Sequence, residues 1–188
     1  LWDPNSYINI MVYNFTTEPN SNSVTLGISH IPFSTTGKHY LEGLGETDYS
    51  HLTLANLQFP LCVSINSLYI NEESTPTEYS TADIAVTLAH ELGHYLGLHH
   101  VFAETDNGTC EDTDYCKDTK SYNKQEYDSK CDYIYENERE KYTFKNLVKR
   151  TGCDGIEFIS YNIMDYAISY SNQFTQNQRE RIRHVLSY

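Results

Sequence analysis

Two histidines four residues apart begin the stretch of this sequence with the most potential metal ligands. His90 and His94 begin the stretch His90–His100, which reads HELGHYLGLHH. On a helix, residues four apart lie one turn above each other on the same face. The spacing therefore predicts that the two imidazoles can bind one metal ion.

A third histidine, His100, lies ten residues after His90. On a continuous helix it would point roughly 80° away from His90, at about 100° per residue. The helix must therefore end and the chain turn back, and Gly97 lies where this has to happen. Glycine adopts the left-handed conformation at a helix C-terminus at almost no steric cost. The spacing predicts a helix, a break and a returning third ligand.

Three neutral histidines leave a tetrahedral zinc ion with one open position, which is typical of catalytic zinc sites. Glu91 points to a different side of the helix from His90, so it is poorly placed as a ligand. It is well placed as the general base for a zinc-bound water, which then attacks an amide. The non-functional alternative, a buried helix that merely contains histidines, requires five fixed residues to coincide by chance. We therefore expect zinc on His90, His94 and His100, with Glu91 as the base.

Three nearby residues also offer ligand atoms. His99 falls one residue short of the required spacing, which favours an exposed or locally hydrogen-bonded role. Glu104 and Glu111 offer carboxylates, and a downstream Glu is the other common third zinc ligand after such a helix. Both, however, lie in a polar loop. With His100 present, none of the three is needed as a zinc ligand.

The pattern His-Glu-x-x-His-x-x-Gly-x-x-His is shared by the metzincin metallopeptidases. Metzincins also carry a tight Met-turn beneath the zinc ligands, and Tyr161–Tyr166 (YNIMDY) resembles it. Within this clan the sequence resembles the pappalysin-like family. The likeness is carried by Trp2–Ile10, by Thr25–Gly27, by the zinc helix through Phe102, and by Asn162–Asp165 followed by Phe174, Thr175 and Gln178. Residues 120–152 carry none of this likeness and match no motif that we can name.

This resemblance implies an α/β (α+β) protein with a metzincin-like zincin fold. A twisted mixed β-sheet would carry the active-site helix, followed by an irregular, disulfide-bearing C-terminal half. Residues 1–188 would form one metallopeptidase catalytic domain, with an upper part at 1–97 and a lower part at 98–188. The implied activity is that of a zinc endopeptidase whose substrate lies extended along a strand at the cleft.

The resemblance also implies roles for residues outside the zinc helix. Tyr166 would donate to the oxyanion, with a tyrosine merely packed under the Met-turn as the alternative. Pappalysin-like enzymes bind calcium just after the zinc helix, and Asp114-x-x-x-Asp118-Thr119 is similar to that segment. A calcium site at these three residues and a solvated acidic loop both stay open, since no EF-hand pattern is present.

The family's preference for arginine after the scissile bond needs an acidic residue shortly after the Met-turn. Ala167–Asn172 offers none, so we expect a neutral or apolar preference. Two other functions keep the same motif: an inactive peptidase-like binding module, and a zinc amide hydrolase with a small substrate.

Four of the five cysteines (Cys110, Cys116, Cys131 and Cys153) fall between His100 and the Met-turn, without a Cys-x-x-Cys pair. We expect two disulfides, with three pairings open, and therefore an oxidising compartment; a second zinc site is the alternative. The fifth, Cys62, lies in an apolar segment and is expected to be a small core residue.

Composition fits one globular domain, with 188 residues, 39% hydrophobic and 13% aromatic. A net charge of −13 argues against nucleic-acid binding, and no apolar run is long enough to span a membrane. We expect a monomer that acts on proteins or peptides in an extracellular, periplasmic or cell-surface location. Because the chain opens at Leu1 without a signal peptide, any signal or anchor would lie outside it.

Three strands are predicted before the zinc helix. Tyr7–Phe15 is apolar on both sides and predicts a central strand buried on both faces. Val24–Ile31 and Leu61–Ile70 predict two more strands, and Pro19–Ser23 predicts a turn. Residues 34–58, with three glycines, read as a loop.

The helices have recognisable starts. Ser80–Asp83 supplies an N-cap and an acidic first turn for the zinc helix. An apolar stripe opposite the histidines predicts packing on the sheet: Ala85, Leu88, Ala89, Leu92 and Leu96. Thr175–Gln178 forms a capping box for a last helix that turns Ile182, Val185 and Leu186 inward.

This stripe can cover one face of the sheet, and the other face would be left bare. We therefore expect an N-terminal part of the same domain to lie upstream and to pack there. The alternative, that residues 120–152 fold back over that face, is disfavoured by their lack of apolar periodicity.

Overall fold

The structure is a computed structural model that describes residues 1–16, 24–48, 52, 53, 55, 57, 61–104 and 109–187. The turn predicted at Pro19–Ser23 and part of the loop at 34–58 lie outside the described residues. The chain forms two compact units, Leu1–Gly97 with Arg181–Tyr188, and Leu98–Glu180. Each unit is described by itself.

The first unit is built on a three-stranded sheet in the order β1-β5-β2. The central strand is β5 (Val63–Asn66), with β1 (Ile10–Tyr13) parallel to it and β2 (Gly27–Ser29) antiparallel. All four residues of β5 are buried. The predicted third strand ends at Asn66, whose side chain accepts a hydrogen bond from the Leu68 amide and begins a 3₁₀ turn, Ser67–Tyr69.

The strand predicted at Tyr7–Phe15 is present but is not buried. β1 lies at the edge of the sheet, and its four residues are exposed, with Val12 at 49%. The prediction of a central strand was wrong because a strand is buried by what packs on it and beside it, and β1 has one strand neighbour in the described part of the chain.

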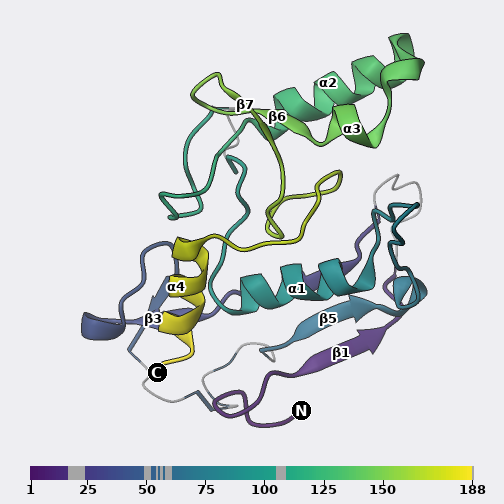
Figure 1. The fold of residues 1–188 in the computed structure, drawn as a ribbon. Coiled ribbons are helices and arrows are strands. Elements are labelled where there is room, and N and C mark those ends of the chain that lie inside the picture. Colours follow the sequence, from purple (N-terminus) through teal and green to yellow (C-terminus); the bar gives the residue numbers. More distant parts are fainter. Residues whose placement is uncertain are drawn as a thin grey trace. The chain divides into compact units, whose positions relative to one another are not determined.

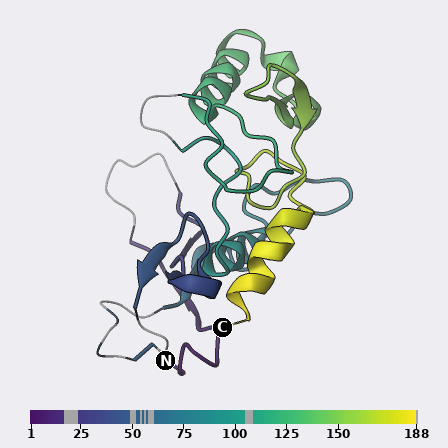
Figure 2. The ribbon, with the colours of Figure 1, turned by 90° about the vertical axis from the view of Figure 1, so that its left-hand side faces the viewer.

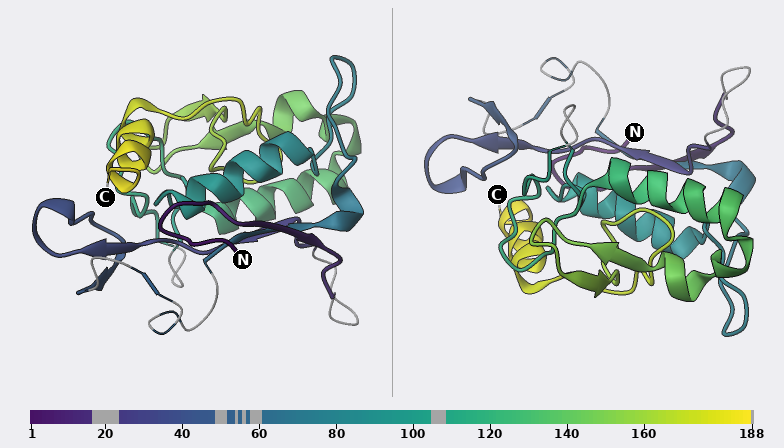
Figure 3. Two further views of the ribbon diagram at one scale, coloured as in Figure 1. Left: turned by 90° about the horizontal axis from the view of Figure 1, so that it is seen from below. Right: turned by 90° about the horizontal axis from the view of Figure 1, so that it is seen from above.

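Helix α1 (Ile84–Tyr95) contacts β2 and β5, and it lies along the sheet in Figures 1 and 3. Its N-cap is Asp83, whose carboxylate accepts hydrogen bonds from the Ala85 and Val86 amides at 2.9 and 3.2 Å. The buried residues of α1 are Thr87, Glu91 and Gly93, whereas Ala85 is exposed and the leucines of the predicted stripe are half-buried. The buried positions of α1 are therefore more polar than predicted.

The end of α1 follows the prediction. Gly97 has φ +88°, and its amide donates to the His94 carbonyl at 2.9 Å. Helix α4 (Gln176–Val185) supplies Arg181, whose guanidinium donates to the Gly97 carbonyl at 3.0 and 3.2 Å. This buried arginine caps the turn, while Leu186, predicted to point inward, is 62% exposed.

The capping box at the start of α4 is confirmed. The Thr175 amide donates to the Gln178 side chain at 2.9 Å, and the Gln178 amide donates to the Thr175 hydroxyl at 3.3 Å.

In the first unit, β3 (Phe33–Thr35) and β4 (Gly45–Thr47) form a short parallel pair flanking a 3₁₀ turn, Gly37–His39, within the region predicted as loop (Figure 2).

The second unit is more regular than predicted. It contains α2 (Lys124–Asn137), a 3₁₀ turn (Arg139–Lys141), α3 (Phe144–Leu147) and the antiparallel pair β6 (Lys149–Thr151) and β7 (Glu157–Ile159). These elements gather at one end of the unit in Figures 1 and 2. α2 was missed because it buries just Tyr127 and Ile134, too few apolar positions to show a period.

Aromatic side chains form the core of this second unit. Phe102, Tyr122 and Tyr127 are buried together, with Cys131 and Phe158 packed against them. Met164 of the Met-turn is fully buried.

One disulfide joins Cys110 and Cys153. The expected second bond is not formed in the described chain: Cys116 is buried at 1% exposure, and Cys131 packs against the aromatic core. Cys62 is buried at 4% exposure, as expected of a core residue. Across the described residues, no helix combines the length and the apolar character needed to cross a membrane.

Candidate active site

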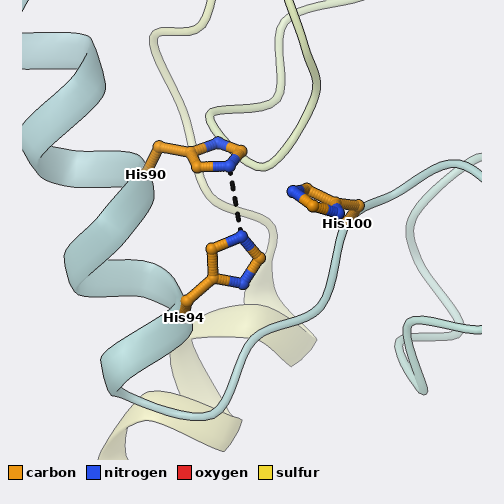
Figure 4. Close-up of side chains that lie close together, drawn as sticks. All are labelled: His90, His94 and His100. Carbon is orange, nitrogen blue, oxygen red and sulfur yellow. Dashed lines mark hydrogen bonds between the residues drawn. The ribbon is translucent and has the colours of Figure 1, made fainter. Parts of the chain in front are cut away.

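The imidazoles of His90, His94 and His100 converge (Figure 4). One ligand atom from each lies within 4.8 Å of the other two, and this is the one group of three or more potential metal ligands found among the described residues. The Nε2 atoms of His90 and His94 are 3.2 Å apart. Two nitrogens that bind one tetrahedral zinc ion at about 2.0–2.1 Å lie about 3.3 Å from each other. The donor set and spacing fit a zinc ion.

Local structure explains this geometry. His90 and His94 are one turn apart on α1, with their rings edge to face at 4.8 Å. The left-handed Gly97 ends the helix, and the next three residues carry the chain to His100.

A carboxylate that sequence reasoning dismissed contacts the third histidine. Glu104 Oε1 contacts His100 Nδ1, so Nε2 of the His100 ring is the nitrogen that could bind a metal ion. Carboxylates on the second nitrogen of a ligating histidine fix the tautomer and the ring orientation. The Phe102 ring stacks on His100 at 4.7 Å. His99, in contrast, packs edge-on against Tyr115 at 5.3 Å.

Glu91 is 8% exposed and lies against β2. A Cβ built on Gly27 would fall 2.5 Å from the Glu91 Cγ, so the carboxylate side chain occupies the space that a side chain at position 27 would need. Burial raises the pKa of Glu91 to about 7. A carboxyl group with a pKa near neutrality can both accept and return a proton.

The Met-turn is held by side chains as well as backbone. The Met164 amide donates to the Asn162 side chain at 2.9 Å, and the Val101 amide donates to the Met164 carbonyl at 3.2 Å. The latter bond ties the turn to the residue directly after His100. The side-chain amide groups of Asn162 and Gln178 form two hydrogen bonds with each other, at 2.8 and 3.1 Å.

Tyr166 lies beside the third histidine. Its ring packs edge-on against His100 at 4.6 Å and against Phe102 at 4.8 Å, and it is 44% exposed. The Lys124 ammonium lies 5.3 Å from the Tyr166 ring centroid. No sequence signal pointed to Lys124, because it comes from the segment 120–152, which contains no recognisable motif.

The residues considered for calcium point to different partners. Asp118 Oδ2 accepts from the Asn177 amide at 3.0 Å, at the start of α4, and the Thr119 hydroxyl donates to the Cys116 carbonyl at 2.6 Å. Asp114 is 2% exposed; its Oδ1 accepts from the Cys116 amide at 2.9 Å, and its Oδ2 has no hydrogen-bond partner among the described residues. Burial raises the pKa of Asp114 to about 7. Glu111, the other weighed carboxylate, is exposed.

Known proteins resemble this chain in sequence and in fold. The family model Peptidase_M43, described as pregnancy-associated plasma protein-A, matches residues 1–187. Proteins named extracellular metalloprotease from Arthroderma benhamiae and Trichophyton verrucosum are each 37% identical over 97 residues, which is 51% of this chain. The same alignments cover 29% of those proteins, so the chain spans less than a third of their length.

A solved structure shares the fold. It is described as Tannerella forsythia mature mirolysin in complex with a cleaved peptide, and it matches with a TM-score of 0.53 and 22% sequence identity. The match covers 97% of this chain and 53% of that one. With the family model spanning nearly the whole sequence, the chain belongs to the pappalysin family of metzincin metallopeptidases.

Proposed function

We propose that this chain is the catalytic domain of a secreted zinc endopeptidase, in which His90, His94 and His100 hold the metal. The observation that carries the proposal is the convergence of three imidazole ligand atoms within 4.8 Å. When bound, zinc supplies a Lewis acid that polarises a carbonyl and lowers the pKa of water. Extracellular action is supported by the names of the relatives and by the Cys110–Cys153 disulfide.

Glu91 is proposed to move the proton. It takes a proton from the attacking water and returns it to the leaving amine, which its raised pKa allows. Its burial against Gly27 holds the carboxylate on one side of α1 and limits the rotamers that it can reach.

The substrate is proposed to lie along β2. Of the two edge strands that the structure describes in this sheet, β2 makes the more extensive contact with α1, and it carries the glycine against which Glu91 packs. An extended peptide that adds to this edge would gain main-chain hydrogen bonds and pass the proposed base.

Tyr166 is proposed to donate its hydroxyl to the oxyanion. Its contact with the His100 ring supports this role, as does its exposed fraction, since a tyrosine that merely filled the core would be buried. Tyr166→Phe removes the hydroxyl and keeps the ring contacts. We expect kcat to fall about 10-fold or more with little change in KM.

The residue after the scissile bond is proposed to be neutral or apolar, because residues 167–172 include no acidic side chain. Cleavage-site profiling on a peptide library measures this directly. A profile dominated by arginine would contradict it.

A calcium ion at Asp114, Asp118 and Thr119, where the sequence is similar to the calcium-binding segment of pappalysin-like enzymes, is a further part of the proposal. The buried Asp114 Oδ2, which has no hydrogen-bond partner among the described residues, is the kind of oxygen that a hard cation binds. We expect calcium to raise the melting temperature of the wild type and to leave Asp114→Asn, which lacks the charge, unchanged. An equal shift in both proteins would place any calcium elsewhere.

Metal removal tests the function as a whole. Incubation with an unfolded protein should give cleavage that a chelator abolishes and zinc restores. Zinc binding without cleavage of any unfolded protein would favour an inactive binding module. Cleavage of small amides but not of peptides would favour the non-peptidase hydrolase.

A further inference from the structure

Arg150 is a fully buried arginine in the segment 120–152, where the sequence offered no recognisable motif. It lies on β6, between two exposed or half-exposed neighbours, and its side chain is completely inaccessible to solvent. Burying a guanidinium removes it from water at a large free-energy cost, and such groups persist where several partners compensate them. The partners of Arg150 therefore indicate what the residue does.

Apart from the Leu147 carbonyl at the end of α3, the hydrogen-bond and ion-pair partners of Arg150 belong to the Met-turn and to the chain just after it. One terminal nitrogen donates to the Leu147 carbonyl at 2.7 Å, and the other donates to the Ile168 carbonyl at 2.9 Å. The second nitrogen also lies 3.5 Å from the Tyr166 carbonyl and 3.4 Å from Asp165 Oδ2. Arg150 thus contacts three of the four residues from 165 to 168.

Asp165 extends this contact into a network. It accepts from the Tyr122 hydroxyl at 2.6 Å and from the Tyr166 amide at 2.8 Å, and it also contacts the Ser160 hydroxyl. The planar guanidinium lies 3.7 Å from the Tyr127 ring centroid, which fixes its orientation.

We infer that Arg150 is a positioning residue for the proposed peptidase site. It fixes the backbone from Asp165 to Ile168, which holds the Tyr166 ring against His100 and sets the shape of the chain that follows the Met-turn. This role rests on the proposed function. This assigns a role to the segment 120–152, because the segment supplies a buried positive charge that binds the backbone after the Met-turn, and none of the motif residues does so.

The test compares Arg150→Lys with Tyr127→Phe. Lysine keeps the charge but cannot donate to separate carbonyls through a rigid fork. Tyr127→Phe is the matched control, since it deletes the 2.7 Å hydrogen bond from Tyr127 to the Leu147 carbonyl in the same cluster and leaves residues 165–168 untouched.

We expect Arg150→Lys to bind zinc like the wild type and to lose about 10-fold or more in kcat/KM. Amide hydrogen exchange over residues 165–170 should speed up by about 10-fold or more. Tyr127→Phe should change neither. Adding Tyr166→Phe to Arg150→Lys should cost much less than it does in the wild type, because the hydroxyl is already misplaced.

A folded Arg150→Lys protein with wild-type kcat/KM and wild-type exchange would overturn the inference. If Arg150→Lys does not fold, Asp165→Asn takes its place, with the same expected losses; failure of both to fold would show a role in folding alone and would also overturn it. A wild-type protein that binds zinc but cleaves nothing would contradict the proposed function, and the exchange measurement would then decide the role of Arg150.

Discussion

At the scale of single residues, the site depends on a glycine opposite the proposed base. Gly27 lies on β2 where any Cβ would approach Glu91 Cγ to 2.5 Å and two further side-chain atoms to 2.8 Å. Glu91 can pack against the strand because position 27 has no side chain. This explains in physical terms why a glycine belongs at this position of the Thr25–Gly27 stretch.

Gly27→Ala should therefore displace the Glu91 side chain. We expect about 10-fold or more loss of kcat/KM at unchanged zinc content, and a loss of about 1–3 kcal/mol in the free energy of unfolding from overpacking. Gly45→Ala on β4 is the control, since its Cβ would meet the nearest atom, in the Phe33 ring, at 3.6 Å, an ordinary contact. Equal activity in the two variants would show that Glu91 does not depend on this space.

Local spacing predicted the histidines and Glu91 because helix geometry fixes where such residues point. Lys124 and Arg150 were not predicted, and Glu104 was considered as a zinc ligand but not as a partner of His100. Lys124 contacts Tyr166, and Arg150 contacts Asp165, Tyr166 and Ile168, in each case from 15 or more positions away in sequence. No period or motif predicts such contacts. Glu104 lies close to His100 in sequence, but its role follows from a loop conformation that spacing does not define.

At the scale of elements, α1 begins at a charged cap. The Asp83 carboxylate is partly buried, which by itself would raise its pKa, but donors at Ser74, Val86 and Ala85 outweigh burial and lower the pKa below its usual value. A carboxylate with a depressed folded-state pKa stabilises the fold above the unfolded-state value, and this stability is lost as the pH falls through the folded-state value.

Asp83→Ala should lower the free energy of unfolding by about 1 kcal/mol near neutral pH. The difference from wild type should shrink below about pH 4, where the wild-type carboxylate becomes protonated. Asp83→Asn is the control: it keeps a capping oxygen, so it should lose less at neutral pH. Denaturant unfolding at two pH values measures both, and a deficit in Asp83→Ala that did not depend on pH would contradict the charge argument.

Elements with strong local signals were predicted well, and those shaped by their surroundings were not. The zinc helix, its break at Gly97 and the capping box of α4 all follow from neighbouring residues. β1 was assigned to the wrong place in the sheet because its apolar sequence says nothing about which strands pair with it. Helix α2 was missed because its exposed face is long and polar.

At the scale of the whole molecule, the Cys110–Cys153 disulfide closes a long loop with a sequence separation of 43. This loop contains α2, β6 and Arg150. Closing a loop of this length restricts the unfolded chain and stabilises the folded one by about 2–4 kcal/mol.

Replacing both cysteines by serine should lower the free energy of unfolding by about 2–4 kcal/mol. Cys131→Ser, which removes a thiol that forms no disulfide, is the control and should cost about 1 kcal/mol or less. Chemical denaturation of the three proteins under non-reducing conditions measures the effect. Equal stability of the double variant and the wild type would mean that the disulfide adds nothing to the fold.

The most direct test of the account is the activity of Glu91→Gln at known zinc content. Glutamine matches glutamate in size and cannot accept the proton, so it isolates the base from the metal site. We expect about one zinc ion per chain, as in the wild type, and a loss in kcat of about 10²–10⁴-fold on an unfolded protein substrate. Full zinc content with near wild-type cleavage would contradict the central claim that Glu91 acts as the base beside a three-histidine zinc site.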